Sequence, residues 1–285
     1  EADTSSQRLS VCNSPHLASK LIAADCLTTE TVEVLYALGE QQRIVGISGY
    51  TVRPPEARKE KPKVFAFTSG DIEKILATQP DLVLTFSDLQ SDISRDLIKA
   101  GVPVYAFNMR SVDDILGMIE TLGRLVGAEA RALALVGELE AQIAETRAIA
   151  AERHARSGRK PRVYFEEWDE PLISGILWAS ELIEIAGGEN IFADRARSPL
   201  AKDRKPTGAE VIAAAPDIII GSWCGKKFRP EKVTARPGWQ DVAAVRSGQL
   251  FEIKSADILQ PGPAALTDGV AQLAAIIGRW SEQHG

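Results

Sequence analysis

Residues 128–156 constrain the fold of this chain more than any other segment, because they contain no proline and only one glycine. The segment is rich in Ala, Glu, Arg and Leu, which are strong helix formers. Apolar side chains recur along one face, at Leu133, Val136, Leu139, Ile143 and Ile149. The pattern predicts a helix about 43 Å long at 1.5 Å per residue, longer than a small domain needs for its own core. A long surface helix and a rigid connection between two lobes both fit this pattern.

On each side of this helix, short apolar segments alternate with helical patterns. The expected strands cover residues 43–49, 64–67, 81–86 and 103–107 before it, and residues 162–166, 217–221 and 250–254 after it. The expected helices cover residues 29–38, 72–78, 92–100 and 111–126 in the first half, and 180–186, 209–215 and 265–280 in the second. A helix end, a Pro-Asp turn and an apolar strand recur at Pro80 and Pro216. Strands that alternate with helices predict parallel βαβ units.

These patterns predict an α/β fold, with a mostly parallel sheet flanked by helices on each side of the long helix. Two lobes joined by this single long helix are one of the two arrangements that fit them, and the following boundaries describe that arrangement. We expect an N-terminal arm (1–20), an N-terminal lobe (21–127), the connecting helix (128–157) and a C-terminal lobe (158–285). The length of 285 residues fits about two domains at roughly 150 residues each.

The composition excludes several classes of function. The chain has 33 Lys and Arg against 39 Asp and Glu, and the resulting net charge of −6 disfavours nucleic-acid binding, which depends on neutralising phosphates. No segment approaches the roughly 18 apolar residues that a transmembrane helix needs. The first residues are polar and acidic, so we expect a secretory signal to be either absent or already removed.

Metal and redox chemistry find little support in the sequence. The three cysteines, Cys12, Cys26 and Cys224, form no CxxC pair, and we expect them to be buried thiols. A disulfide between Cys12 and Cys26 is an open alternative. The histidines lie in the arm, on the long helix and at the C-terminus: His16, His154 and His284. Because they are so far apart, we expect no metal site, no catalytic histidine and no intrinsic cofactor.

Four carboxylates follow one another at the end of the strand expected at residues 162–166: Glu166, Glu167, Asp169 and Glu170. The carboxyl ends of strands face the ligand crevice in α/β sheets, and paired carboxylates can carry out acid–base chemistry. Successive residues of a strand point to opposite faces, however, so these acids need not converge. We therefore expect a solvated rim. An α/β enzyme that uses this cluster on a nucleotide or sugar is the least favoured function, since the chain also has no phosphate-binding glycine motif.

Aromatic residues gather where the expected strands end. They are Tyr50, Phe67 and Phe86 in the first half, and Trp168, Trp178 and Trp223 in the second. Each one alone fits core packing. As a group they lie where the loops of two lobes would face each other, an arrangement suited to sandwiching a large, flat, partly apolar ligand.

Further motifs, in their order and spacing, resemble one protein family. They include residues 28–39 (TTETVEVLYALG), 43–50 (RIVGISGY), 80–84 (PDLVL), 178–192 (WASELIEIAGGENIF) and 216–220 (PDIII). The chain resembles the periplasmic substrate-binding proteins of the helical-backbone (class III) type, which serve bacterial importers of cobalamin, haem and ferric siderophores. Within that family, residues 164–174 and 222–227 look most similar to cobalamin-binding members.

The resemblance implies two α/β lobes joined by the helix at residues 128–156, a ligand in the cleft between them, and no catalysis. Tyr50 matches the aromatic residue that family members place in the cleft. The family docks to its permease through one acidic residue on each lobe, and Glu73 matches the first. Ala209 stands at the second position and Glu210 follows it, although Thr207 and Glu210 also form a capping-box pattern. We take Glu73 and Glu210 as the docking candidates.

These expectations describe the binding protein of an ABC importer. It would be periplasmic or otherwise extracytoplasmic after removal of its signal peptide, and it would deliver cobalamin or a related corrinoid to the membrane permease. The candidate ligand contacts are Tyr50, Arg53, Phe67, Phe86, Trp168, Trp178 and Trp223. We expect a monomer that binds a small metal chelate and no nucleic acid.

The alternative is a ferric siderophore or haem in the same cleft. Anionic groups of such ligands call for convergent basic side chains, which Arg53, Lys226, Lys227 and Arg229 can supply. Tyr50 can also serve as an axial ligand to haem iron.

Overall fold

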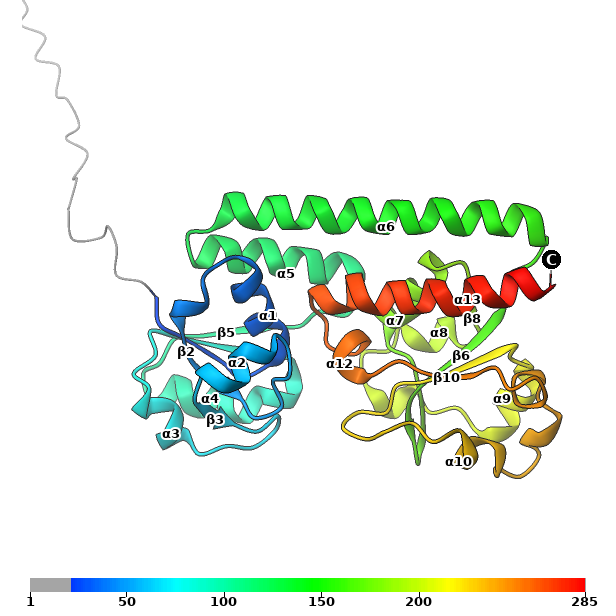
Figure 1. The fold of residues 1–285 in the computed structure, drawn as a ribbon. Helices are drawn as coiled ribbons and strands as arrows, with labels where there is room; N and C mark the ends of the chain where they lie inside the picture. The colour runs from blue at the N-terminus through cyan, green and yellow to red at the C-terminus, as the bar shows by residue number, and fades with distance from the viewer. Residues whose placement is uncertain (1–21, 285) are drawn as a thin grey trace, which may run out of the picture.

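The computed structural model describes residues 22–284, so the expected arm (1–20), with Cys12 and His16, lies outside the described residues. Two sheets occupy opposite ends of the molecule, and the helix α6 (Glu129–Ser157) runs along both of them (Figure 1). The predicted α/β fold with a long connecting helix is therefore confirmed.

The first sheet has five parallel strands in the order β3-β2-β1-β4-β5. They are β1 (Ala24–Cys26), β2 (Ile44–Ser48), β3 (Lys63–Phe65), β4 (Leu82–Phe86) and β5 (Val104–Phe107). The helices between them are α1 (Thr29–Ala37), α2 (Pro55–Glu60), α3 (Ile72–Ala77) and α4 (Ser91–Lys99). The chain reverses its direction of winding between β1 and β4, and in open α/β sheets the crevice beside such a reversal is where ligands bind.

The second sheet has the order β10-β9-β6-β7, with β8 also paired to β6. Its strands are β6 (Arg162–Asp169), β7 (Leu172–Ser174), β8 (Glu189–Asn190), β9 (Ile218–Gly221) and β10 (Leu250–Glu252). All pairs are parallel except the hairpin of β6 with β7. The accompanying helices are α7 (Leu177–Ile185), α8 (Ala193–Ala196), α9 (Gly208–Ala214), α10 (Pro230–Thr234), α11 (Ala243–Arg246), α12 (Ser255–Ile258) and α13 (Val270–His284).

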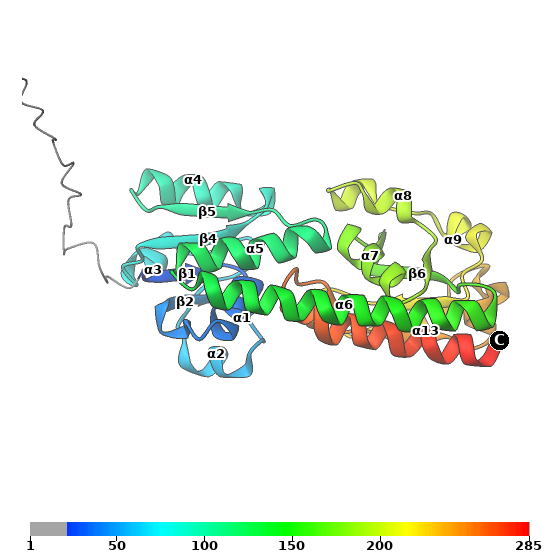
Figure 2. The ribbon, with the colours of Figure 1, turned by 90° about the horizontal axis from the view of Figure 1, so that it is seen from above.

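The helix α6 does not connect the two sheets unsupported. It packs against α5 (Val112–Leu125) near its start and against α13 along its later turns (Figure 2). The largest hydrophobic cluster is continuous from Leu35 in α1 through Leu139 in α6 to Trp280 in α13. One apolar core therefore extends through both halves and holds them at a set spacing.

Glycines in the sequence predicted several helix ends correctly. Gly39 and Gly158 follow α1 and α6 with φ of +68° and +74°, a conformation that glycine adopts without steric cost. The helix expected at residues 265–280 differs, because it opens with a π-helical turn (Ala265–Gly269) and continues to His284. At Gly269 a Cβ atom would lie 2.5 Å from the Asp257 carbonyl oxygen, so the backbone of this turn lies directly against α12. Within residues 22–284 no helix has both the length and the apolar character to span a membrane.

Candidate functional site

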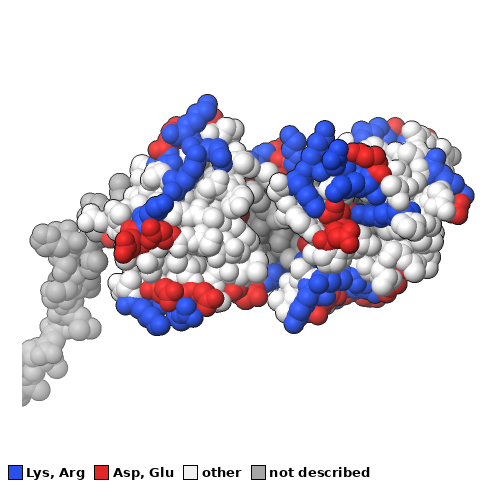
Figure 3. Space-filling view, turned by 90° about the horizontal axis from the view of Figure 1, so that it is seen from below, with Lys and Arg blue, Asp and Glu red and all other residues white. Residues whose placement is uncertain are grey.

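The carboxyl ends of the strands in both sheets face the space between the lobes. Arg53, in the loop after β2, contacts Asp257, which follows β10. On the other flank Arg110, which follows β5, donates a hydrogen bond to the Pro199 carbonyl at 3.2 Å. The loops between these two flanks line a hollow that is visible between the lobes in Figure 3. We call this hollow the cleft.

The first lobe presents an apolar wall to the cleft. Four exposed side chains follow the strands β2, β3 and β4 of the first sheet: Tyr50, Val52, Phe67 and Leu89, with exposed fractions of 61%, 43%, 37% and 55%. A single exposed apolar residue needs no explanation, but a group of them at one sheet edge marks a binding surface. Tyr50 and Phe67 were predicted here, and the structure places both at this wall.

The second lobe presents a basic wall. The Lys226 ammonium lies 3.8 Å from the ring centroid of half-buried Trp168 and also pairs with Asp169. Lys232 Nζ lies 3.4 Å from the other Asp169 oxygen. Burial acts to raise the pKa of Asp169, but the hydrogen bonds from Lys226 and Lys232, the Lys226 charge and a backbone hydrogen bond together outweigh it, and that pKa lies below its usual range. Lys227 is exposed beside them, and Figure 3 shows Lys and Arg side chains gathered on this lobe next to the cleft.

Three other aromatic candidates lie in the interior. Trp178 is 3% exposed and its indole N–H donates to the Ile258 carbonyl at 2.9 Å. Trp223 is 2% exposed and donates to Glu166 Oε1 at 2.9 Å. Phe86 is also buried. A position at the end of a strand did not predict whether a ring is buried, as these three are, or exposed, as Tyr50 is. A side chain at such a position can pack against the interior of its own lobe. Contrary to the expectation, the three rings pack inside the lobes and leave little surface for a ligand.

Arg53 is engaged by protein carboxylates. Its Nη1 lies 3.1 Å from Asp257, its Nη2 2.6 Å from Asp268 and its Nε 3.5 Å from Glu33. Burial raises the pKa of Glu33, against the hydrogen bond from the Ala264 N–H and the charge of Arg53. Because Asp257 and Asp268 belong to the second lobe, Arg53 joins the two lobes at one flank of the cleft. Both Nη atoms donate to carboxylates of the second lobe in that role, which differs from the predicted ligand contact.

The acidic cluster is not the solvated rim that we expected. Glu166 is fully buried and accepts two hydrogen bonds from Arg236, at 2.7 Å and 2.9 Å. Glu167 pairs with Arg204 at 2.9 Å and accepts from the Ile176 N–H at 2.6 Å. Burial raises the pKa of Glu167, and the Arg204 charge opposes that rise. The solvated-rim prediction is wrong for these two acids, because each forms an ion pair within its lobe. No cluster of His, Cys, Asp or Glu in residues 22–284 is arranged to hold a metal ion.

The sequence pattern of the periplasmic binding protein family matches residues 26–256, which include the second sheet and all of the first sheet except the start of β1. The chain belongs to that family. It is 28% identical over 212 residues to a protein of Yersinia pestis (strain Pestoides F) named vitamin B12-binding protein, with 73% of this chain and 71% of that one aligned. It is 24% identical over 279 residues to the uncharacterized ABC transporter substrate-binding lipoprotein YvrC of Bacillus subtilis (strain 168), covering 95% and 83%.

Solved structures of periplasmic binding proteins share the fold. The periplasmic heme-binding protein RhuT from Roseiflexus sp. RS-1 in apo form superposes with a TM-score of 0.74 at 24% identity, covering 90% of this chain and 99% of that one. At this identity the likeness concerns the fold. The predicted resemblance to the helical-backbone type is confirmed by the family match and by this superposition.

The two docking candidates of this periplasmic binding protein differ in their surroundings. Glu73 is exposed on the first turn of α3, whose N-terminus Asp71 caps. Glu210 instead accepts a hydrogen bond from the Thr207 N–H at 2.7 Å and pairs with Arg195. The Thr207 backbone, followed by Arg195, lowers the pKa of Glu210 to about 2. The predicted capping box of α9 is confirmed, and it occupies this carboxylate.

Two residues of the apolar wall were missed in the sequence. Val52 lies in the loop after β2 and Leu89 lies in the short 3-10 helix Asp88–Gln90 after β4, and both are exposed. An aliphatic residue a few positions after the end of a strand, with polar residues around it, is the signal that would have identified both.

Proposed function

We propose that this periplasmic binding protein serves an ABC importer and carries cobalamin or a related corrinoid in its cleft. The observation that supports this most is the apolar wall of Tyr50, Val52, Phe67 and Leu89, whose side chains are exposed beyond the carboxyl ends of first-lobe strands. The names of the Yersinia and Bacillus relatives agree with this proposal. The function involves no catalytic step.

Binding would proceed by burial and stacking. A corrin ring has broad apolar faces, and each square ångström of apolar surface removed from water contributes roughly 25 cal/mol. Tyr50 and Phe67 would cover one face, and Trp168 with Lys226 would approach from the other lobe. The continuous core and the Arg53 ion pairs already hold the two lobes in place. Ligand binding would therefore cost little conformational entropy, which favours the binding free energy.

A second ligand, haem, is favoured by the basic wall. Lys227 is exposed, and in the described part of the chain its ammonium has no ion-pair partner, so it can bind an anionic carboxylate. The exposed Tyr50 hydroxyl is of the type that coordinates haem iron in some proteins. A ferric siderophore would use the same basic side chains.

An absorbance experiment distinguishes between these two candidate ligands. The protein is mixed with cyanocobalamin, or with haem, then desalted, and the retained spectrum is recorded together with a calorimetric titration. Retention of the corrin band at one equivalent supports the proposal. Retention of haem alone overturns the corrinoid assignment in favour of the second candidate, and retention of neither overturns both.

A matched pair of variants locates the site. Tyr50→Ala should weaken corrinoid binding at least tenfold, because it removes the most exposed ring of the apolar wall. Tyr105→Ala removes a ring that is 38% exposed in the middle of β5, away from the strand ends, and should leave the affinity unchanged. Equal effects of the two substitutions would place the ligand elsewhere.

We further propose that the protein is a monomer in the periplasm or another extracytoplasmic space and that Glu73 contacts the permease. The exposure of Glu73 supports this contact, whereas the engagement of Glu210 in its capping box disfavours a second one through that residue. Size-exclusion chromatography with light scattering tests the oligomeric state.

A further inference from the structure

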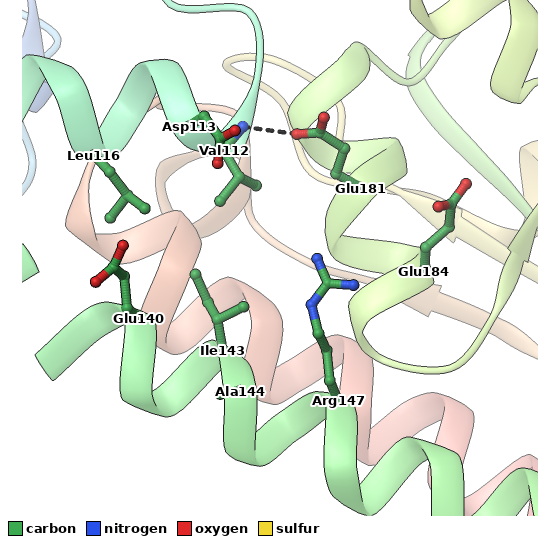
Figure 4. A pocket seen from close by; sticks show the side chains of 9 residues that line it. All are labelled: Val112, Asp113, Leu116, Glu140, Ile143, Ala144, Arg147, Glu181 and Glu184. Carbon is green, nitrogen blue, oxygen red and sulfur yellow. Dashed lines mark hydrogen bonds between the residues drawn. The ribbon is translucent and has the colours of Figure 1, made fainter. Parts of the chain in front are cut away.

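The spacing between the two lobes is fixed by contacts between α5 and α7 as well as by Arg53 and Arg110. The Val112 N–H at the start of α5 donates to Glu181 Oε2 on α7 at 2.7 Å, beside a pocket that these helices line together with α6 (Figure 4). The Trp178 N–H donates to the Arg110 carbonyl at 3.0 Å. A cleft of set width fits its ligand through the local shape of its walls, so the residues that hold each wall in place affect binding.

Gln90 is buried beside two residues of the apolar wall. It is the last residue of the 3-10 helix that contains Leu89. Its Oε1 accepts a hydrogen bond from the Phe86 N–H at 2.9 Å, and its Nε2 donates to the carbonyls of Leu27 at 3.2 Å and Phe67 at 2.8 Å. One buried amide therefore connects the chain segments that follow β1 and β3 to the end of β4.

The partners of Gln90 determine which way its amide points. A reversed amide would place its NH2 group against the Phe86 N–H and its oxygen against two carbonyl oxygens. Among side chains of this length, only this amide supplies two donors and an acceptor without a charge. The backbone of Phe67, a wall residue, and the 3-10 helix with Leu89, another wall residue, are therefore attached to the same side chain.

The backbone of Ser87, at the start of this turn, is strained. Its φ of 53° and ψ of −174° form a combination that is open to glycine and rarely adopted by other residues. The Ser87 N–H donates to the Phe107 carbonyl at 2.7 Å, and its hydroxyl oxygen accepts from the Leu89 N–H at 3.3 Å. Such a conformation persists only where the surrounding contacts prevent it from relaxing. The hydrogen bonds of Gln90 are among those contacts.

We propose that Gln90 is a positioning residue of the ligand site, which keeps Phe67 and Leu89 in place on the apolar wall against the tendency of Ser87 to relax. The inference rests on the proposed function, because it takes the apolar wall as the ligand's binding surface. Without the amide, the Phe86 N–H and two carbonyls lose these hydrogen bonds inside the lobe. Ser87 would then relax towards an ordinary conformation, and the wall would shift with it.

The experiment is a calorimetric titration of the full chain with cyanocobalamin, or with haem where only haem is retained. Gln90→Met keeps the length of the side chain but removes its hydrogen bonds, and should weaken binding by about fivefold or more. Adding Ser87→Gly should recover about twofold or more of this loss, because glycine adopts the conformation of residue 87 without steric cost. Ser87→Gly alone should change the affinity by less than about twofold.

Hydrogen exchange of the peptide that spans residues 86–91 reports on the turn without any ligand. Its amides should exchange faster in Gln90→Met than in the unmodified protein, because the turn is no longer held. Exchange should slow again when Ser87→Gly is added. Thermal melting verifies that each variant is folded, and Gln90→Asn, whose amide is one methylene shorter, replaces Gln90→Met if that variant does not fold.

Ala215→Gly is the matched control. Ala215 also has a positive φ, of 44°, but it lies at the end of α9 beside the amino end of β9, opposite the cleft. Added to Gln90→Met, it should raise the melting temperature without restoring the affinity. Equal recovery by Ala215→Gly and Ser87→Gly, unchanged affinity of Gln90→Met, or unchanged exchange in that variant overturns the positioning role alone. Failure of the unmodified protein to bind either ligand overturns the proposed function, and this inference with it.

Discussion

Arg53 and Asp257 are 204 residues apart in the chain, yet Arg53 Nη1 donates to Asp257 Oδ1 at 3.1 Å and so joins the two lobes beside the cleft. Asp268 and Glu33 surround the same guanidinium. Arg110 makes a similar connection on the other flank, through the Pro199 carbonyl. The cleft is therefore bounded at both flanks by arginines of the first lobe that reach the second.

The Arg53–Asp257 pair should contribute measurably to stability. A double-mutant cycle of Arg53→Ala and Asp257→Ala, measured by urea unfolding, should give a coupling free energy of about 0.5–1 kcal/mol, because solvent screens a side chain that is 31% exposed. The control cycle uses Arg95 and Asp92 on α4, which are 56% and 88% exposed, and should give about half that value or less. Equal coupling in the two cycles would contradict a special role for Arg53.

Glu30 should make the protein less stable as the pH rises. It lies in the first turn of α1, is 3% exposed, and burial raises its pKa from 4.5 to about 7. Between these two values the folded form holds a proton that the unfolded form has released, so the free energy of unfolding falls as the pH rises through this window and stays low above it. At about 1.4 kcal/mol for each pKa unit, the loss is on the order of 3 kcal/mol at most.

Urea unfolding at about pH 5 and about pH 8 measures this effect. Glu30→Gln removes the titrating carboxyl and should reduce the dependence, leaving the part due to the other carboxyls whose pKa burial raises, such as Asp25 (to about 6), Glu33 and Glu167. A variant that loses as much stability as the unmodified protein between the two pH values would show that Glu30 is not the group responsible.

Two tryptophans of the second lobe should respond oppositely to substitution. Trp223→Phe keeps a buried ring but removes the hydrogen bond to Glu166, and should lower the free energy of unfolding by about 1–3 kcal/mol with little effect on ligand affinity. Trp168→Ala removes a half-buried ring at the cleft, and should weaken ligand binding by on the order of 1–3 kcal/mol with a smaller change in stability. Calorimetry and urea unfolding of both variants test this, and reversed effects would exchange the two roles.

The long helix could be predicted to within a residue at each end, as residues 128–156 against Glu129–Ser157. Its composition and the glycine that ends it are local properties, and local properties can be read from neighbouring residues. The central strand β1 was missed, because its three residues are too few to show a pattern and are identified only by their pairing with β2 and β4.

The site was harder to predict than the fold. Tyr50 and Trp223 both follow strands of the expected sheets, but one is 61% exposed and the other 2%. The difference depends on Phe228 and Glu166, which meet the Trp223 ring only after folding. The partners of Arg53 likewise come from the far end of the chain. Sequence spacing therefore predicted the sheet edge at which we propose the site, whereas the direction of each side chain depends on long-range packing.

Glu73 and Glu210 should differ in their effect on transport. Glu73→Arg reverses an exposed charge on α3 and should impair uptake through the permease while leaving ligand affinity and melting temperature unchanged. Glu210→Gln keeps the capping hydrogen bond to Thr207 but removes the charge, and should leave uptake unchanged because that carboxylate is engaged by Thr207 and Arg195. Glu210→Ala loses the cap and should lower the free energy of unfolding by about 0.5–2 kcal/mol.

Uptake into vesicles that contain the permease is the measurement. Loss of uptake with Glu210→Gln at normal stability would assign Glu210 to the docking surface, and loss of ligand affinity with Glu73→Arg would remove Glu73 from it.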